Sequence, residues 1–144
     1  MSKASEITAQ LIAQLELIKP ANGFTTDVKK VYPFADIVPD GAALPCILVS
    51  IDSDTMEESV GVQAKRMREF DIQVVFKRGA TQSDLDDAHI DVLCALGFGM
   101  YPHERVLKGL VTDQQEAVFE MASQGGNFTS VTVSVSCAYV ENYA

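Results

Sequence analysis

The chain has little positive charge, with 11 lysine and arginine residues against 20 aspartate and glutamate residues and a formal net charge of −9. General DNA binding depends on positive charge and counterion release, so this balance argues against it. Tryptophan is absent, and every apolar run is shorter than the ~18 residues that a membrane span needs. The start, MSKASEITAQ, is polar and has no apolar signal core, which predicts a protein that is neither secreted nor anchored in a membrane.

Cysteine is also scarce. The three residues, Cys46, Cys94 and Cys137, have no CxxC spacing, and each stands inside an apolar segment. This usage is typical of reduced, buried thiols in a cytosolic protein. A zinc site would need further ligands in tight spacing, so we expect none.

The apolar residues that are present recur with two periods. Every three to four residues they mark helices, and every second residue they mark strands. The helices are expected over residues 4–18, capped by Ser2 or Ser5, and over residues 81–97, capped by Thr81 or Ser83. The second helix would turn Leu85, His89, Val92 and Leu96 inward. The expected strands are 28–32, 46–51, 70–76, 116–122 and 128–140, with a turn at 123–127 between the last two.

This order of elements predicts one domain over residues 1–144 with an α+β fold. Strand runs separated by one helix favour a mostly antiparallel mixed sheet of four to five strands, with two main helices packed on one face. Residues 53–64, SDTMEESVGVQA, show no clear period. They are expected to form a long loop or a mobile hairpin tip that orders on assembly.

Catalytic and metal-binding patterns are weak. One cluster of metal-ligating residue types lies at the start of the second helix and consists of Asp84, Asp86, Asp87, His89 and Asp91. Acidic residues are favoured near a helix N-terminus, and a histidine is common at the edge of the core, so these two features explain the cluster better than a metal site. Cys94 and His89 would lie on different helix faces, and His103 lies in a loop without an obvious partner. We therefore expect no enzyme, no cofactor and no bound metal.

The stretch KRMREFDIQVVFKR, residues 65–78, holds five of the eleven lysines and arginines. Its alternation places Arg66 and Arg68 on the same side as the apolar row that begins at Phe70. One interpretation is an interface in which Lys65, Arg66 and Arg68 meet the acidic segment of another copy, formed by Asp52, Asp54, Glu57 and Glu58. A solvated rim paired locally with Glu69 and Asp71 is an alternative, and a nucleic-acid patch is a weaker one because carboxylates interrupt it.

The chain resembles the tail terminator proteins of long-tailed bacteriophages, the family that includes the lambda minor tail protein U. The resemblance lies in the order of the expected helices and strands and in the residue pattern within each of them, over almost the whole length. It is carried by the first helix through Ile18 and by the segments DVKKVY, LPCILVSID, SDTMEES, REFDIQVVF, SDLDDAHIDVLCAL and FTSVTVSVSCAYV. The segment 97–115 and the basic flanks of 65–78 depart from it.

This resemblance implies an α+β domain that assembles into a homohexameric ring at the head-proximal end of the phage tail. The ring would cap the tail tube, end its polymerisation and offer the docking surface for the head. The implied partners are further copies of the chain, the tail tube protein and the head–tail connector protein, assembled in the bacterial cytoplasm and kept in the virion. DNA would only pass through, and six copies at −9 each would bring −54 formal charges around the channel. Another ring-forming neck or tail-completion protein, a nucleic-acid-binding module and a small enzyme with a site near His89 or His103 are the alternatives.

Overall fold

The computed structural model of this chain describes residues 2–105, 107–122 and 126–144. Its helices and strands follow in the order α1 (Lys3–Leu15), β1 (Val31–Pro33), β2 (Cys46–Val60), β3 (Gln63–Lys77), α2 (Gln82–Ala95), β4 (Leu110–Glu120) and β5 (Phe128–Asn142). Two short 3-10 turns, η1 (Pro20–Asn22) and η2 (Pro102–Glu104), lie in the connections.

One sheet joins all five strands, in the order β1-β2-β3-β5-β4. The β1–β2 pair is parallel, and the three other pairs are antiparallel. β3 is the central strand, and β5 pairs with it along its whole length, from Gln63 opposite Asn142 to Lys77 opposite Phe128. The α+β class, the mixed and mostly antiparallel sheet and the two main helices are confirmed.

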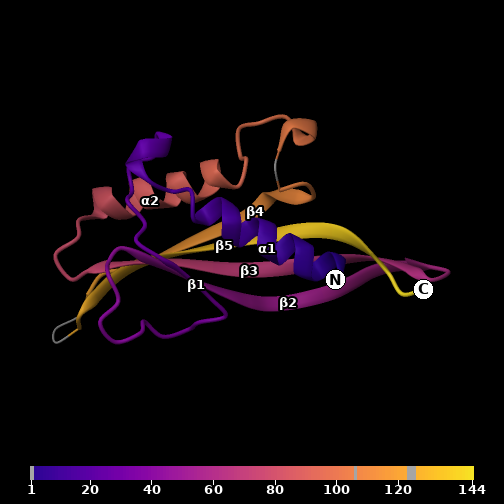
Figure 1. Cartoon of the computed structure of the whole chain (residues 1–144), viewed down its shortest axis with the longest axis horizontal. Coiled ribbons are helices and arrows are strands. Elements are labelled where there is room, and N and C mark those ends of the chain that lie inside the picture. Colours follow the sequence, from indigo (N-terminus) through magenta and orange to yellow (C-terminus); the bar gives the residue numbers. More distant parts are fainter. Residues whose placement is uncertain (1, 106, 123–125) are drawn as a thin grey trace.

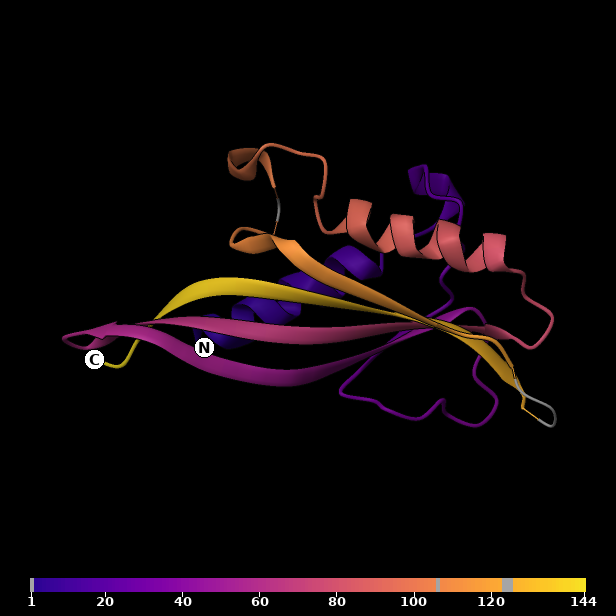
Figure 2. The ribbon, with the colours of Figure 1, turned by 180° about the vertical axis from the view of Figure 1, so that it is seen from behind.

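Both helices cover the same face of the sheet, as Figures 1 and 2 show. The main core lies between them and that face, and includes Leu11 and Leu15 of α1, Leu85 of α2 and Phe70 and Ile72 of β3. On the opposite face a smaller cluster of Cys46, Leu48 and Val75 is covered by apolar residues of the segment that leads from β1 to β2. Burial of these side chains from water is the main stabilising contribution.

The helix ends follow the capping residues in the sequence. The Ser2 hydroxyl accepts a hydrogen bond from the amide of Ser5 and starts α1. Thr81 and Asp84 form a reciprocal capping box at the start of α2, in which each side chain accepts from the other's amide. The prediction of His89 at the edge of the core is correct, because its side chain is only partly buried; the fully buried position beside it belongs to Ala88.

The prediction of a long loop over residues 53–64 is wrong. β2 continues to Val60 and pairs with β3 as far as Gln63, so only Gly61 and Val62 form the turn. Gly61 has a φ of +60°, a conformation that glycine adopts without steric cost. The alternative expectation for this segment, a hairpin tip, is correct.

We call the outer part of this hairpin, together with the end of β5, the arm; it consists of residues 52–69 and 136–142. The arm extends beyond the two helices along the long axis of the molecule (Figures 1 and 2). β1 pairs with β2 at Ile47 to Val49, so it borders the inner part of β2 rather than the arm.

β4 begins at Leu110, earlier than the predicted 116, and its pairing with β5 shifts register between Val111 and Glu116. Gly109, just before β4, has a φ of +84°, and a Cβ atom there would lie 2.0 Å from the carbonyl oxygen of Ala138. The chain can therefore approach β5 this closely only at a glycine. The predicted turn at 123–127 lies partly outside the described residues.

Candidate functional site

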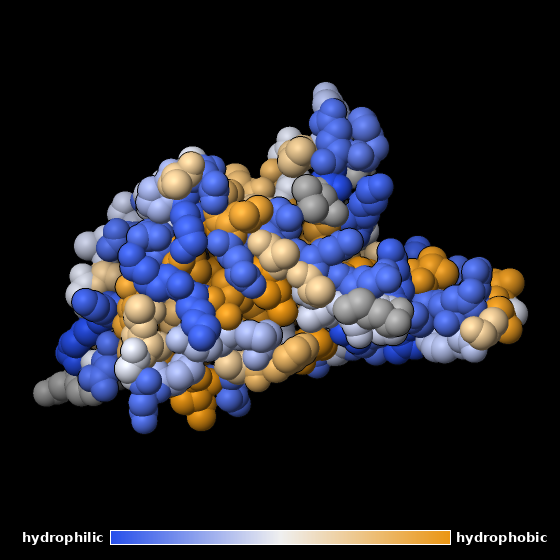
Figure 3. Space-filling view, viewed as in Figure 1, coloured by the Kyte–Doolittle hydropathy of each residue, from blue (hydrophilic) through white to orange (hydrophobic). Residues whose placement is uncertain are grey.

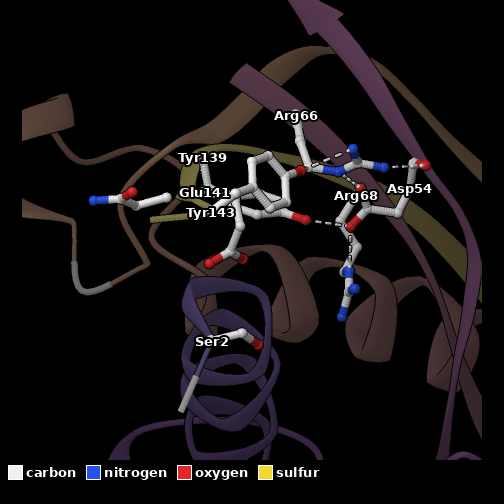
Figure 4. Close-up of a pocket in the computed structure, with 8 residues that line it drawn as sticks. Ser2, Asp54, Arg66, Arg68, Tyr139, Glu141 and Tyr143 are labelled. Atoms are coloured by element: carbon white, nitrogen blue, oxygen red, sulfur yellow. Dashed lines mark hydrogen bonds and ion pairs between the residues drawn. The ribbon is translucent and has the colours of Figure 1, made fainter. Parts of the chain in front are cut away.

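A cluster of polar side chains from three strands marks the base of the arm. Asp54 comes from β2, Arg66 and Arg68 from β3, and Tyr139 from β5, and all four share the sheet face toward α1 (Figure 4). The two oxygens of the Asp54 carboxylate accept from Nε of Arg66 at 2.5 Å and from Nε of Arg68 at 2.7 Å. The Tyr139 hydroxyl donates to the same carboxylate. One carboxylate thus joins all three strands of the arm.

A β-bulge places Asp54 on this face. Ile51 lies opposite Phe70 and Ser53 lies opposite Glu69, so Asp52 is an extra residue in β2. In an unbroken strand Asp54 would point to the other face from Ile51, but the extra residue brings both to the same face. A second register shift, between Met56 and Glu58, makes Glu57 the next extra residue. These two bulges also explain why residues 53–64 lack a clear period in the sequence.

The cluster continues into helix α1. Nη1 of Arg68 donates to the Thr8 hydroxyl at 3.1 Å. Glu141, at the end of β5, accepts hydrogen bonds from the backbone amides of Lys3 and Ala4, both at 3.1 Å. A carboxylate at this position satisfies helix-terminal amides and interacts favourably with the helix dipole. The arm is therefore attached to α1 at two points.

Arg66 makes two further contacts. Nη2 donates to the backbone oxygen of Asp54 at 3.1 Å, and Nη1 donates to the Tyr143 hydroxyl at 3.2 Å. The side chains of Arg66, Arg68 and Asp54 are 22%, 19% and 17% exposed. Because they are mostly out of water, these charge-assisted bonds are stronger than those of an exposed ion pair.

These contacts shift the ionisation of several groups. Burial alone disfavours the Asp54 carboxylate, but hydrogen bonds from Tyr139, Arg66 and Arg68 outweigh burial and lower its pKa. Burial, together with the bond to Asp54, raises the pKa of Tyr139 to about 12. The amides of Lys3 and Ala4 lower the pKa of Glu141. At neutral pH Asp54 and Glu141 are therefore charged and the tyrosine is neutral.

An open hollow of about 450 Å³ lies over the cluster, and Ser2, Tyr143 and Asn142 form its other walls. The guanidinium donors described above point at Asp54, Thr8 and Tyr143 rather than into this space. The arrangement fastens three strands and one helix together. It is suited to holding the arm in one direction rather than to acid–base or nucleophilic chemistry.

The structure sorts the residues predicted for an interface between copies into two groups. Arg66 and Arg68 pair with Asp54, and Lys65 lies 3.9 Å from Glu57, all within one chain. Asp52 and Glu58 are exposed on the arm. The predicted local ion pairs with Glu69 and Asp71 are not the arrangement observed, because these carboxylates accept from Ser53 and Ser134.

Sequence reasoning missed Thr8, Tyr139 and Glu141. Each is distant in sequence from residues 52–68, and a polar residue near a strand end has no distinctive local pattern. The alternation of β5 did predict that Tyr139 shares a face with Val135 and Cys137, and that face is buried.

The acidic residues of α2 do not converge on one point. Asp84 belongs to the capping box, Asp86 accepts from Gln82, and the buried Asp91 accepts from the Thr26 amide at 2.7 Å. The ring of His89 packs edge-on against Phe119 at 6.0 Å. Over residues 2–105, 107–122 and 126–144, the structure places no three His, Cys, Asp or Glu side chains so that they could hold a metal ion.

The prediction for the cysteines is correct for two of them. Cys46 and Cys137 are buried, and burial raises the pKa of both thiols, for Cys137 to about 11. Cys94 is exposed, so its predicted burial is wrong. It lies on the side of α2 away from the sheet, beside Leu17 and Met100.

No family model matches this chain, and no curated protein matches it. Neither helix of the described part of the chain is long and apolar enough to cross a membrane.

Proposed function

We propose that this chain is a structural protein of a phage tail, and that its copies form a hexameric ring at the head-proximal end of the tail tube. The ring ends polymerisation of the tube and provides the surface to which the head is joined. The proposal begins from the resemblance in element order to the tail terminator proteins. Its partners are further copies of the chain, the tail tube protein and the head–tail connector protein.

The projecting arm is the observation that carries this proposal. It exposes large apolar side chains far from the main core, with Val60 at 73%, Val62 at 54% and Val140 at 53% exposure. Exposed apolar patches of this kind mark surfaces that bind other proteins. The Asp54 cluster holds the arm in place before any partner arrives, which reduces the ordering cost of association.

The cluster also bears on the nucleic-acid alternative. Two of the five cations in residues 65–78, Arg66 and Arg68, are committed to Asp54. Phosphate contacts would require them to give up that carboxylate. This favours assembly with protein partners over DNA binding.

Mass and morphology test the proposal together. Purified protein should pass from 15.6 kDa to a species of about 94 kDa, six times that mass, as concentration rises or when tail tubes are added. Negative-stain electron microscopy should show rings, alone or at one end of each tube. Infected cells that lack the protein should contain tails of irregular length without heads.

Other outcomes separate the alternatives. Tails of normal length without heads would point to a neck or tail-completion protein instead. Salt-dependent retention of the monomer on DNA would favour the nucleic-acid-binding module.

A further inference from the structure

The two ends of β3 differ in charge. At the arm end, Lys65, Arg66 and Arg68 all lie beside carboxylates of the same chain. At the other end stand Lys77 and Arg78, both exposed, and Arg78 donates to the backbone oxygen of Gly126 at 2.8 Å. A backbone oxygen does not neutralise the cationic charge of Arg78.

Beside Lys77 the surface is hollowed. An open depression of about 250 Å³ is lined by Leu44, Pro45, Phe76, Lys77 and Ala80. Four of these five residues are apolar, and the fifth, Lys77, is charged. Phe128, which pairs with Lys77, adds an apolar ring that is 44% exposed. We call this surface the basal hollow.

The arm tip has the opposite character. It presents the exposed apolar residues Val60 and Val62 on either side of the turn at Gly61. The acidic residues Glu57 and Glu58 precede them. Lys65 lies 3.9 Å from Glu57 and opposite Glu58 in the strand pairing, so these two carboxylates share one lysine and one negative charge is left over. Figure 3 shows apolar surface at the outer end of the arm, next to hydrophilic surface.

We propose that the arm tip of one copy binds in the basal hollow of a second copy, with Val60 and Val62 against the apolar lining and Glu58 facing Lys77. This inference rests on the proposed self-assembly and names the two surfaces that meet. The charges are complementary, and both surfaces combine an apolar centre with charge at the side, as protein interfaces do.

The two surfaces cannot meet within one molecule. They lie at opposite ends of β3, whose 15 residues span roughly 50 Å at about 3.3 Å per residue. Figures 1 and 2 place the arm tip and the start of the connection to α2 at opposite ends of the long axis. Because the two surfaces differ, a pair of bound copies still has one free arm and one free hollow. Such a contact repeats from copy to copy and closes into a ring when the rotation allows it.

Charge exchange tests the contact. Glu58→Lys and Lys77→Glu each place like charges in the interface, and each should raise the concentration needed for half-assembly by about tenfold or more. The double variant Glu58→Lys with Lys77→Glu restores the opposite charges and should return assembly close to that of the wild type. Asp87→Lys and Lys108→Glu are matched controls, because they make the same changes of charge at exposed positions outside both surfaces. Circular dichroism verifies that each variant is folded.

A second pair of variants tests the apolar part. Val60→Ser with Val62→Ser should weaken assembly, whereas Val118→Ser, on an exposed valine of β4, should not. Single charge variants that assemble like the wild type would overturn the inference and leave the proposed ring intact. A double charge variant that stays impaired would show that the two residues do not face each other, and would also overturn it. A wild-type chain that stays at 15.6 kDa at all concentrations and beside tail tubes would refute the proposed function itself.

Discussion

Replacement of Asp54 by asparagine tests whether one carboxylate holds the arm. Asparagine keeps the shape of the side chain but removes its charge, so two neighbouring guanidinium groups lose the anion that they share. Hydrogen bonds to charged groups contribute about 1.5 to 3 kcal/mol each, and a broken buried ion pair costs about 3 to 5 kcal/mol. Because the hollow beside the cluster is open to water, we expect a loss of about 2 to 3 kcal/mol in the free energy of unfolding.

Urea unfolding monitored by circular dichroism measures this loss. With a slope of about 2 kcal/mol per molar urea, the midpoint should fall by about 1 to 1.5 M. All variants are compared at one protein concentration, because assembly also stabilises the folded chain. Asp52→Asn is the matched control, since it removes the same charge from an exposed bulge residue two positions away.

The effect of Asp54→Asn should depend on pH. The folded chain lowers the pKa of Asp54, so its carboxylate contributes stability above the unfolded value of about 3.9. This contribution is lost as the pH falls through the lower folded pKa, and the wild type and Asp54→Asn should then converge. A midpoint for Asp54→Asn that shifts no more than that of Asp52→Asn at pH 7 would refute this account of the arm.

Three further predictions concern other groups of the fold. Tyr139→Phe should lower the free energy of unfolding by about 1 kcal/mol below pH ~10, and this difference should disappear as the pH rises through the folded pKa of about 12. An absorbance titration in which Tyr139 ionises near its ordinary pKa would contradict this. Glu141→Gln should increase amide exchange at the first turn of α1, measured by mass spectrometry, because the charged acceptor for two helix amides is lost; unchanged exchange would show that the helix end does not depend on it. A thiol reagent should modify Cys94 rapidly in the native protein and should reach Cys46 and Cys137 only on unfolding; three equal rates would contradict the observed burial.

Regular alternation and helical spacing predicted most of the elements. The apolar row of β3 indicated both a strand and the face of Arg66 and Arg68, since parity is a local property of an extended chain. The capping residues Ser2 and Thr81 were also predictable, because a cap depends on residues three positions apart. Both helices and the alternation of β5 were predictable as well, because each depends on a periodic pattern within one short segment.

Predictions failed where a position depends on distant neighbours. Cys94 stands in an apolar run, yet it is exposed because α2 turns that side away from the sheet. The burial of Ala88 was not predicted either, although His89 lies at the edge of the core as expected. A helical period indicates that one face is buried without specifying its centre to within one residue.

The sequence by itself determined the two helices, the inner parts of the strands, the acidic balance and the gathering of cations in residues 65–78, but not the outer parts of β2 and β3. Only the tertiary structure decided which charges neutralise one another. The extra residue at Asp52 turns Asp54 to the face of Arg66 and Arg68, and the register of β5 brings Tyr139 to the same point. A bulge changes the direction of every following side chain, and register is set by pairing between distant segments, so neither can be read from a local pattern.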